Sequence, residues 1–264
     1  MKISDQTVLI TGASGGIGRA LALKLAEEKA NLILTGRNAE TLAALQQQIL
    51  NTGTQCRYVV ADITTEVGRH AILASCLESP RVTTLINCMG TNSFESFERQ
   101  SEQQIIELIQ TNLTSTMLLT HTILPELLKL PEALLITIGS TFGGIGYPGY
   151  AAYCASKFGL RGFHEALQRE LADSTVKSLY VAPRATDTGI NSDKVVALNN
   201  ELGNHMDSPT WVAEQVLRAM RKNLRSTYLG WPEKLFVRLN GIFPALVGGA
   251  IIKQLPIIKK YLLQ

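Results

Sequence analysis

Short apolar segments alternate with longer amphipathic segments along most of the chain, and this order limits the fold more than any other feature. Each apolar segment is a nearly unbroken run of aliphatic and β-branched residues, as in strands that are buried on both faces. Strands separated by helices pair in parallel through right-handed crossovers. The predicted strands are Thr7–Thr11, Asn31–Thr35, Arg57–Ala61, Thr83–Asn87, Ala133–Ile138, Lys177–Ala182 and Ser226–Gly230.

The amphipathic segments between these strands have the spacing of helices that cover a sheet. The predicted helices are Ile17–Lys29, Ala39–Leu50, Glu66–Leu77, Glu102–Gln110, Leu113–Leu128, Tyr150–Ala172 and Trp211–Lys222. We therefore predict an α/β fold with a doubly wound parallel sheet, a Rossmann fold. Residues 1–230 form the expected nucleotide-binding and catalytic domain, and residues 231–264 form a helical C-terminal extension. Ligands bind such sheets beyond the carboxyl ends of the strands.

Composition excludes several other classes of protein. Of the 264 residues, 45% are hydrophobic and 18% are charged, so the chain can bury a core and is not disordered. Four scattered cysteines and four histidines lack the spacing of a metal site or a disulfide framework, and we expect no metal. The N-terminus lacks the apolar segment of an export signal, so the cytoplasm is the expected compartment. We expect no nucleic-acid partner.

A glycine-rich turn joins the first predicted strand to the first predicted helix. Glycines there allow a tight turn and let backbone N–H groups approach a pyrophosphate, which the positive end of the helix dipole also attracts. The residues predicted to bind the phosphates are Gly12, Ser14, Gly15, Gly16, Ile17 and Gly18.

The end of the second strand carries Arg37 where NAD-binding sites place an acid. A guanidinium pairs with a 2′-phosphate, whereas a carboxylate repels it. The sequence therefore favours NADP(H) over NAD(H). After the third strand, Asp62 and the adjoining Ile63 are placed to contact the adenine, although Asp62 could equally cap the next helix.

Several polar residues at the expected site could take part in acid–base chemistry. Tyr153 and Lys157 lie four residues apart and share one face of a predicted helix, where an ammonium lowers the pKa of a phenol. Ser140 follows the fifth strand, and Asn87 ends the fourth. Asn112 lies where two helical segments meet, and its side-chain amide could hold a water.

Together with the glycine turn, these residues resemble the short-chain dehydrogenase/reductase family over roughly residues 5–230. The resemblance implies that Tyr153 exchanges a proton with the substrate oxygen and that Ser140 hydrogen-bonds this oxygen. It implies that Lys157 orients the ribose and that Asn112 holds a water. The remaining residues that it assigns to the cofactor site are Asn87, Gly90, Pro183, Thr186 and Thr188. The chain departs from the family pattern at Met89, which replaces an alanine, and at Arg184, which replaces a glycine.

The substrate side of the expected site is apolar, and the C-terminal extension is basic. The segment Asn191–Ser208 is predicted to form a helical lid, with Phe142, Tyr147 and Tyr150 beside it. From Gln215 onward, nine Lys/Arg face a single acid, and Pro244 and Pro256 divide an apolar segment into two or three predicted helices. This extension could contact a membrane surface, or it could pack over the active-site mouth or across a dimer; we expect a homo-oligomer.

These features together predict an NADP(H)-dependent oxidoreductase that interconverts a ketone and a secondary alcohol on a hydrophobic, lipid-like small molecule. Two alternatives stay open. The first is a 3-oxoacyl thioester reductase of lipid synthesis, for which the basic extension would suit an acidic carrier protein. The second is a non-catalytic nucleotide-binding sensor on the same fold.

Overall fold

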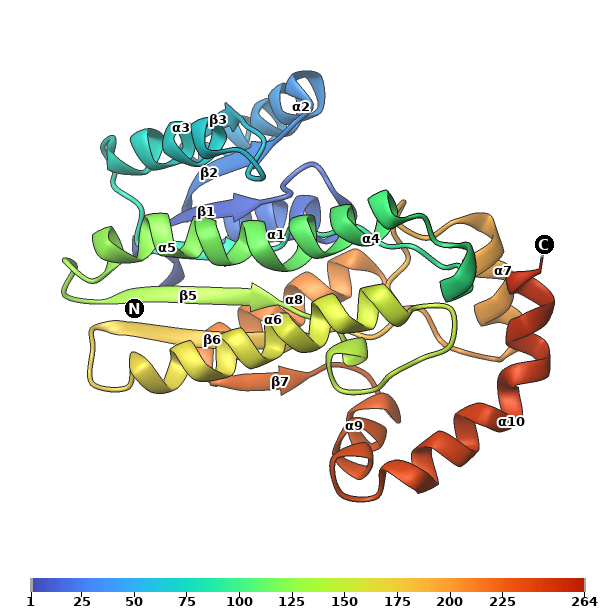
Figure 1. Ribbon diagram of the computed structural model, residues 1–264. Coiled ribbons are helices and arrows are strands. Elements are labelled where there is room, and N and C mark those ends of the chain that lie inside the picture. The colour runs from blue at the N-terminus through green and yellow to red at the C-terminus, as the bar shows by residue number, and fades with distance from the viewer. Residues whose placement is uncertain (1, 264) are drawn as a thin grey trace.

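The computed structural model describes residues 2–263, and within them seven strands form one open sheet with the order β3-β2-β1-β4-β5-β6-β7 (Figure 1). Every neighbouring pair is parallel. The predicted fold class is therefore confirmed. The strands are β1 (Thr7–Thr11), β2 (Asn31–Gly36), β3 (Cys56–Val60), β4 (Thr84–Asn87), β5 (Ala133–Ile138), β6 (Val176–Ala182) and β7 (Ser226–Tyr228).

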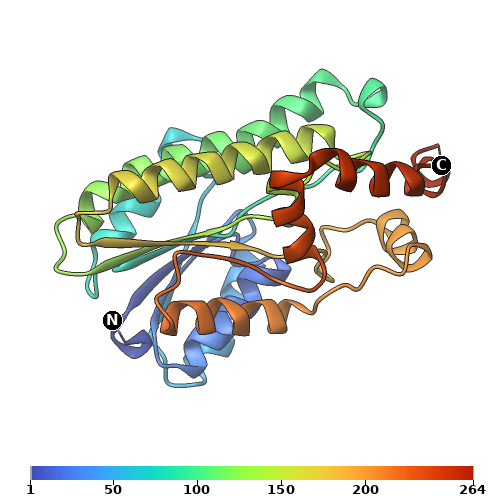
Figure 2. The ribbon, with the colours of Figure 1, turned by 90° about the horizontal axis from the view of Figure 1, so that it is seen from below.

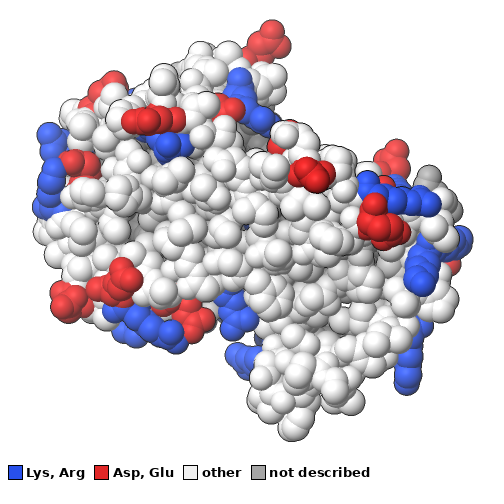
Figure 3. Space-filling model, in the orientation of Figure 1, with Lys and Arg blue, Asp and Glu red and all other residues white. Residues whose placement is uncertain are grey.

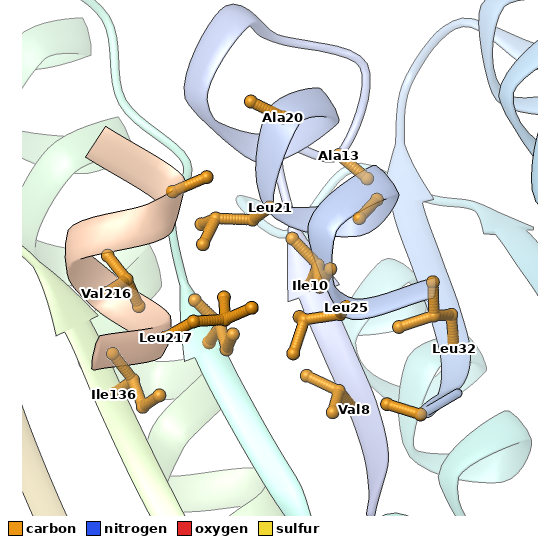
Figure 4. Close-up of a cluster of buried hydrophobic side chains, with 14 of the residues drawn as sticks. Val8, Ile10, Ala13, Ala20, Leu21, Leu25, Leu32, Ile136, Val216 and Leu217 are labelled. Atoms are coloured by element: carbon orange, nitrogen blue, oxygen red, sulfur yellow. The ribbon is translucent and has the colours of Figure 1, made fainter. Parts of the chain in front are cut away.

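Helices cover both faces of the sheet, as the continuous apolar strands require (Figure 2). One face packs against α1 (Gly16–Glu27), α2 (Ala39–Leu50) and α8 (Pro209–Arg221). The other packs against α3 (Glu66–Leu77), α5 (Ser115–Leu127) and the end of α6 (Ala151–Glu170). In Figure 4, apolar side chains of α1 and α8 meet over the central strands, Leu21 and Leu25 from the first helix and Val216 and Leu217 from the second.

The strands all point toward the end of the molecule where the remaining helices gather (Figure 1). These are α4 (Glu102–Ile109), α7 (Asp193–Glu201), α9 (Glu233–Ile242) and α10 (Pro244–Leu262), with short 3₁₀ turns at Phe97–Arg99 and Thr141–Gly143. A further 3₁₀ turn, Ile3–Asp5, precedes β1 at the opposite end of the sheet. β1 and β4 are neighbours, and the chain leaves them toward opposite edges of the sheet. This reversal opens a crevice at their carboxyl ends, which is the expected ligand position.

Two local features differ from a simple helical pattern. The helical segments predicted to meet near Asn112 are joined by a π-helical turn, Gln110–Thr114, so that α4 and α5 continue one another. Pro244 begins α10, as predicted, but the expected break at Pro256 is wrong because α10 continues through it. Pro256 is exposed, so water can satisfy the carbonyl that loses its helical hydrogen bond.

Candidate active site

A cleft of about 690 Å³ lies at the carboxyl ends of β1 and β4. Most of the residues predicted to form the site line it. They are Gly12, Ser14, Gly15, Gly16, Ile17, Gly18, Arg37, Ile63, Gly90, Ser140, Tyr153, Lys157, Pro183, Thr186 and Thr188. Asp62, Asn87 and Asn112 are not among the lining residues.

The turn after β1 requires glycine at two positions. Gly12 has φ +63°, in the left-handed region. A Cβ on Gly18 would lie 2.2 Å from the carbonyl oxygen of Gly12, so the turn cannot close with a larger residue. Because Gly15 at the N-cap of α1 has no side chain, the first amide N–H groups of this 12-residue helix are left for an anion in the cleft.

The loops that follow β4 and β6 complete this cradle. The Thr11 hydroxyl accepts hydrogen bonds from the backbone N–H groups of Cys88 and Met89, at 2.9 and 3.1 Å, and so ties the end of β4 to the end of β1. The methyl group of Thr188 lies 2.4 Å from the position of a Cβ on Gly16. Thr188 is therefore held directly over the start of α1.

Arg37 lies exposed at the rim of the cleft, directly after β2. The Ser14 hydroxyl is its neighbour on this side, 3.2 Å from where Gly36 would carry a Cβ. Asn38 accepts a hydrogen bond from the Thr41 N–H and caps α2, so its side chain is already engaged. Arg37 and Ser14 are therefore the side chains available to bind a ligand group that lies beyond the end of β2.

Asp62 and Asn87 are engaged by the protein itself. Asp62 accepts hydrogen bonds from the Thr64 N–H and hydroxyl, at 2.9 and 2.8 Å. Although partial burial acts to raise the pKa of Asp62, these bonds and the charge of Arg37 lower it overall. The cap of α3 is Thr65 rather than Asp62. Asn87 donates its amide to Thr120 on α5, at 2.9 Å, and is buried.

Tyr153, Lys157 and Ser140 meet at the wall formed by α6 and the end of β5. The Lys157 ammonium lies 5.7 Å from the centre of the Tyr153 ring, one helical turn along α6. The Ser140 oxygen accepts a hydrogen bond from the Phe142 N–H, at 3.1 Å. The hydroxyl keeps its own proton to donate, and its interaction with Tyr153 acts to lower the pKa of the phenol.

Burial sets the protonation of this group of residues. It raises the pKa of Tyr153 to about 12, against the opposite effect of the bond from Ser140. Burial also lowers the pKa of Lys157 to about 8. The pKa of Tyr153 is thus shifted in the direction opposite to the acidification by Lys157 that the sequence predicts. The phenol holds its proton at neutral pH, which is the form that can donate to a carbonyl oxygen.

Asn112 is fully buried in the π-helical turn, and its amide has three protein partners. Its oxygen accepts from the Thr91 N–H at 2.7 Å, while its NH₂ group donates to the Thr91 carbonyl at 2.9 Å and to Ser156 at 3.1 Å. These bonds hold the amide in place, and its contact with a water stays a prediction. Asn112 also fixes the loop after β4 beside Lys157, since both its oxygen and the ammonium lie 3.4 Å from the position of a Cβ on Gly90.

Aromatic side chains line one part of the cleft. The ring of Phe142 lies 5.2 Å from that of Tyr147, in a stacked arrangement, and 5.1 Å from that of Tyr150. Val195 of α7 packs on the same cluster, and Leu198 also lines the cleft. Phe142, Tyr147 and Tyr150 therefore line the cleft beside a helical segment, where the sequence predicts the substrate.

Arg184, at the end of β6, forms a buried ionic network at the mouth of the cleft. Its guanidinium makes two bonds of 2.9 Å to the Asp207 carboxylate, one of 3.0 Å to Glu233 and one of 2.9 Å to the Trp231 carbonyl. These contacts join the loop before α8 to the C-terminal extension. Gly230, with φ +86°, leaves room for the arginine, because a Cβ there would lie 2.5 Å from its Cδ.

Sequence reasoning missed residues whose partners lie far along the chain. Asp207 and Glu233 have no motif around them, and their contacts with Arg184 mark them. Gln254 of α10 lines the cleft and accepts a hydrogen bond of 3.4 Å from the Tyr147 hydroxyl. The C-terminal extension therefore contributes directly to the aromatic part of the cleft.

A family model described as short chain dehydrogenase matches residues 6–198. The chain belongs to this family. The match includes the glycine turn, Ser140, Tyr153 and Lys157 and ends within α7. This short-chain dehydrogenase is thus an oxidoreductase, and α8 to α10 lie beyond the part that the family model matches.

Curated relatives agree with this assignment. The chain is 33% identical over 195 residues to an uncharacterized oxidoreductase, DltE, of Bacillus subtilis, covering 72% of this chain and 75% of the relative. It is 32% identical over 202 residues to the 3-oxoacyl-[acyl-carrier-protein] reductase FabG of Vibrio cholerae, covering 76% of this chain and 80% of FabG.

Solved structures share the fold over nearly the whole chain. A short-chain dehydrogenase/reductase from Burkholderia phymatum in complex with NAD has a TM-score of 0.84 and 20% identity, with 93% of this chain and 96% of that one covered. A short-chain dehydrogenase from Sphingobium yanoikuyae in complex with NADPH has a TM-score of 0.78 and 25% identity, with 92% and 95% covered.

Proposed function

We propose that this short-chain dehydrogenase uses NADP(H) to interconvert a ketone and a secondary alcohol on a hydrophobic, lipid-like substrate. The convergence of Tyr153, Ser140 and Lys157 beside a glycine cradle carries this proposal. The cradle fits a dinucleotide, because a Cβ on Gly16 or Gly18 would fill the space against Thr188 or the Gly12 carbonyl. The N-terminus of α1, Gly90 and Lys157 would hold its phosphates and ribose.

The chain's own residues would move the proton and orient the substrate. A bound nicotinamide supplies the hydride in reduction and accepts it in oxidation. Ser140 donates a hydrogen bond to the substrate oxygen, and Tyr153 donates its phenolic proton to the same oxygen as the carbonyl is reduced. In the reverse direction Tyr153 takes that proton back from the alcohol. Lys157, with its positive charge in a buried position, stabilises the phenolate that forms.

The preference for NADP(H) rests on Arg37 and Ser14 at the rim. A guanidinium and a hydroxyl are donors for a 2′-phosphate, and the turn Thr35–Asn38 contains no carboxylate that would repel it. Among the structural neighbours, the protein from Sphingobium yanoikuyae was solved with NADPH and that from Burkholderia phymatum with NAD. We expect Arg37→Asp to weaken NADPH binding about tenfold to a hundredfold more than NADH binding, since one or two charge-assisted hydrogen bonds are lost.

Cofactor titrations followed by protein fluorescence measure this preference. Arg169→Asp is the matched control, because Arg169 is exposed at the far end of α6 and should leave both affinities unchanged. Equal weakening of NADPH and NADH by Arg37→Asp would contradict the assignment of the 2′-phosphate site. A preference of the unmodified chain for NADH would contradict it as well.

The aromatic and aliphatic wall supports a hydrophobic substrate. The rings of Phe142 and Tyr150 lie 6.3 and 5.9 Å from that of Tyr153, and Tyr147 and Leu198 line the same cleft. A panel of ketones and alcohols of increasing chain length, assayed with NADPH and NADP⁺, tests this. Catalytic efficiency should rise with chain length; a preference for short polar carbonyls would overturn the substrate class.

A second candidate function is reduction of a 3-oxoacyl thioester. It is favoured by the similarity to the FabG reductase of Vibrio cholerae. Assaying the same 3-oxoacyl group free, as a simple thioester and on an acyl carrier protein separates the candidates. Much higher efficiency on the carrier-bound form would favour this second function.

A further inference from the structure

The junction of α9 and α10 exposes six consecutive uncharged residues, 241–246. Ile242, Phe243 and Leu246 are 69%, 58% and 66% exposed, and we name these three residues the apolar tip. Scattered exposed apolar side chains are ordinary, but large ones gathered at one protruding turn mark a contact surface. In Figure 3 the lobe formed by α9 and α10 is uncharged at its lower end.

The inner sides of the two helices hold this apolar tip away from the body of the protein. Val237 of α9 and Val247 of α10 are buried against Ile145. Asn240 donates a hydrogen bond of 2.9 Å to the Gly144 carbonyl. Farther along α10, Ile258 is buried with residues of α7. The helices thus use their other faces for packing, and the apolar tip is left outward.

Basic side chains flank the apolar tip on both helices. Arg238 lies one helical turn before Ile242, about 6 Å along α9, and Lys253 lies two turns after Leu246, about 10 Å along α10. Both are exposed, as are Lys234 and Lys259. Residues 231–264 contain one acid, Glu233, and it pairs with Arg184. The surface around the apolar tip is therefore positively charged, as the blue side chains beside the lower lobe show (Figure 3).

We propose that the apolar tip inserts into the surface of an anionic phospholipid bilayer. Insertion to a depth of about 5–10 Å would bury Ile242, Phe243 and Leu246 and bring Arg238 and Lys253 to the level of the lipid phosphates. Within residues 2–263 no helix is both long enough and apolar enough to cross a membrane, so this contact is peripheral.

A bilayer matches this surface better than a second copy of the chain does. Around a two-fold axis, the same patch of both copies would meet, and the basic residues of one would face those of the other. Anionic headgroups instead complement them. Because Gln254 of α10 and Glu233 of α9 line the cleft, the contact would bring its mouth close to the lipid. The proposal concerns binding and does not depend on the reaction.

Vesicle flotation with the full chain tests this inference. We expect the protein to float with vesicles containing phosphatidylglycerol and to stay unbound with phosphatidylcholine alone. Phe243→Ser combined with Leu246→Ser should lower the partition coefficient at least about tenfold. Arg238→Gln combined with Lys253→Gln should also lower it at least about tenfold on the anionic vesicles. Val67→Ser is the matched control, since Val67 is 81% exposed on α3 and should not matter.

Several results would overturn the proposal. They are failure of the unmodified chain to float, equal flotation of the apolar-tip variant, and equal binding to vesicles without anionic lipid. Sedimentation velocity of the same variants identifies the competing arrangement. If the apolar-tip substitutions dissociate an oligomer while the unmodified chain ignores vesicles, the surface joins two copies of the chain instead. Thermal melting of each variant confirms that a loss of flotation does not come from unfolding.

Discussion

Replacing Arg184 by methionine should destabilise the protein far more than removing an ordinary surface charge. The Arg184 side chain is 11% exposed and its partner Asp207 only 5%. The guanidinium satisfies Asp207 with two hydrogen bonds and also binds Glu233 and the Trp231 carbonyl. The hydrogen bond to Asp207 is the main cause that raises the pKa of Arg184 above its ordinary value, and the charges of Glu233 and Asp207 raise it further. Arg184→Met would leave the Asp207 carboxylate buried without its main partner.

Loss of one member of a buried ion pair costs about 3–5 kcal/mol. For a chain of this size, each kcal/mol lowers the melting temperature by about 2–4 °C, so we expect a drop of roughly 6–20 °C. By contrast, Arg169 pairs with Glu165 on the surface and is 75% exposed. Arg169→Met should cost less than about 1 kcal/mol.

Urea denaturation and calorimetry of Arg184→Met, Arg169→Met and the double variant Arg184→Met/Asp207→Asn measure these differences. The double variant removes the stranded charge as well, so it should be more stable than Arg184→Met alone. The reasoning is refuted if Arg184→Met stays within about 1 kcal/mol of the unmodified chain. It is also refuted if the double variant is less stable than Arg184→Met.

Two further predictions concern pH and the glycine turn. Burial lowers the pKa of His164 to about 4, below its value of about 6.5 in an unfolded chain, so folding favours the neutral ring. This stabilisation is fully present above pH 6.5, and up to about 3 kcal/mol of it is lost as the pH falls toward 4. His164→Gln should flatten this part of a pH–stability profile measured by urea titrations. An unchanged profile would contradict the assignment of this pH dependence to His164. Gly18→Ala should weaken NADPH binding at least about tenfold because its Cβ would strike the Gly12 carbonyl. Gly162→Ala on α6, where a Cβ meets nothing within 4 Å, is the control and should not change the cofactor Kd; equal affinity of the two variants would show that the turn does not hold the phosphates.

Features that repeat locally could be predicted from the sequence. The alternation of strands and helices determined the parallel sheet, because each apolar run needs helices on both faces. The cleft followed from it, since the carboxyl ends of β1, β4 and β5 meet at one edge. Ser140, Tyr153 and Lys157 could be predicted because each belongs to a local sequence motif that is expected at that edge.

Features that depend on contacts between distant segments could not be predicted. Arg184 reaches Asp207 and Glu233, which are 23 and 49 residues away, and no spacing rule relates them. The hydrogen bonds between the Asn112 amide and Thr91, which lies 21 residues earlier, follow from no spacing rule either. The pKa of Tyr153 depends on how deeply packing buries the phenol, and a four-residue spacing from lysine cannot show that.

The central claim is that Tyr153 gives a proton to a substrate oxygen while the glycine cradle holds the phosphates of a nicotinamide cofactor. The most direct measurement compares Tyr153→Phe with the unmodified chain for NADPH binding and for NADPH oxidation with an accepted ketone. We predict that the Kd for NADPH stays within about threefold and that turnover falls by about 10²–10⁴, the usual contribution of a general acid. Turnover retained at the unmodified rate, with NADPH still bound, would contradict the account.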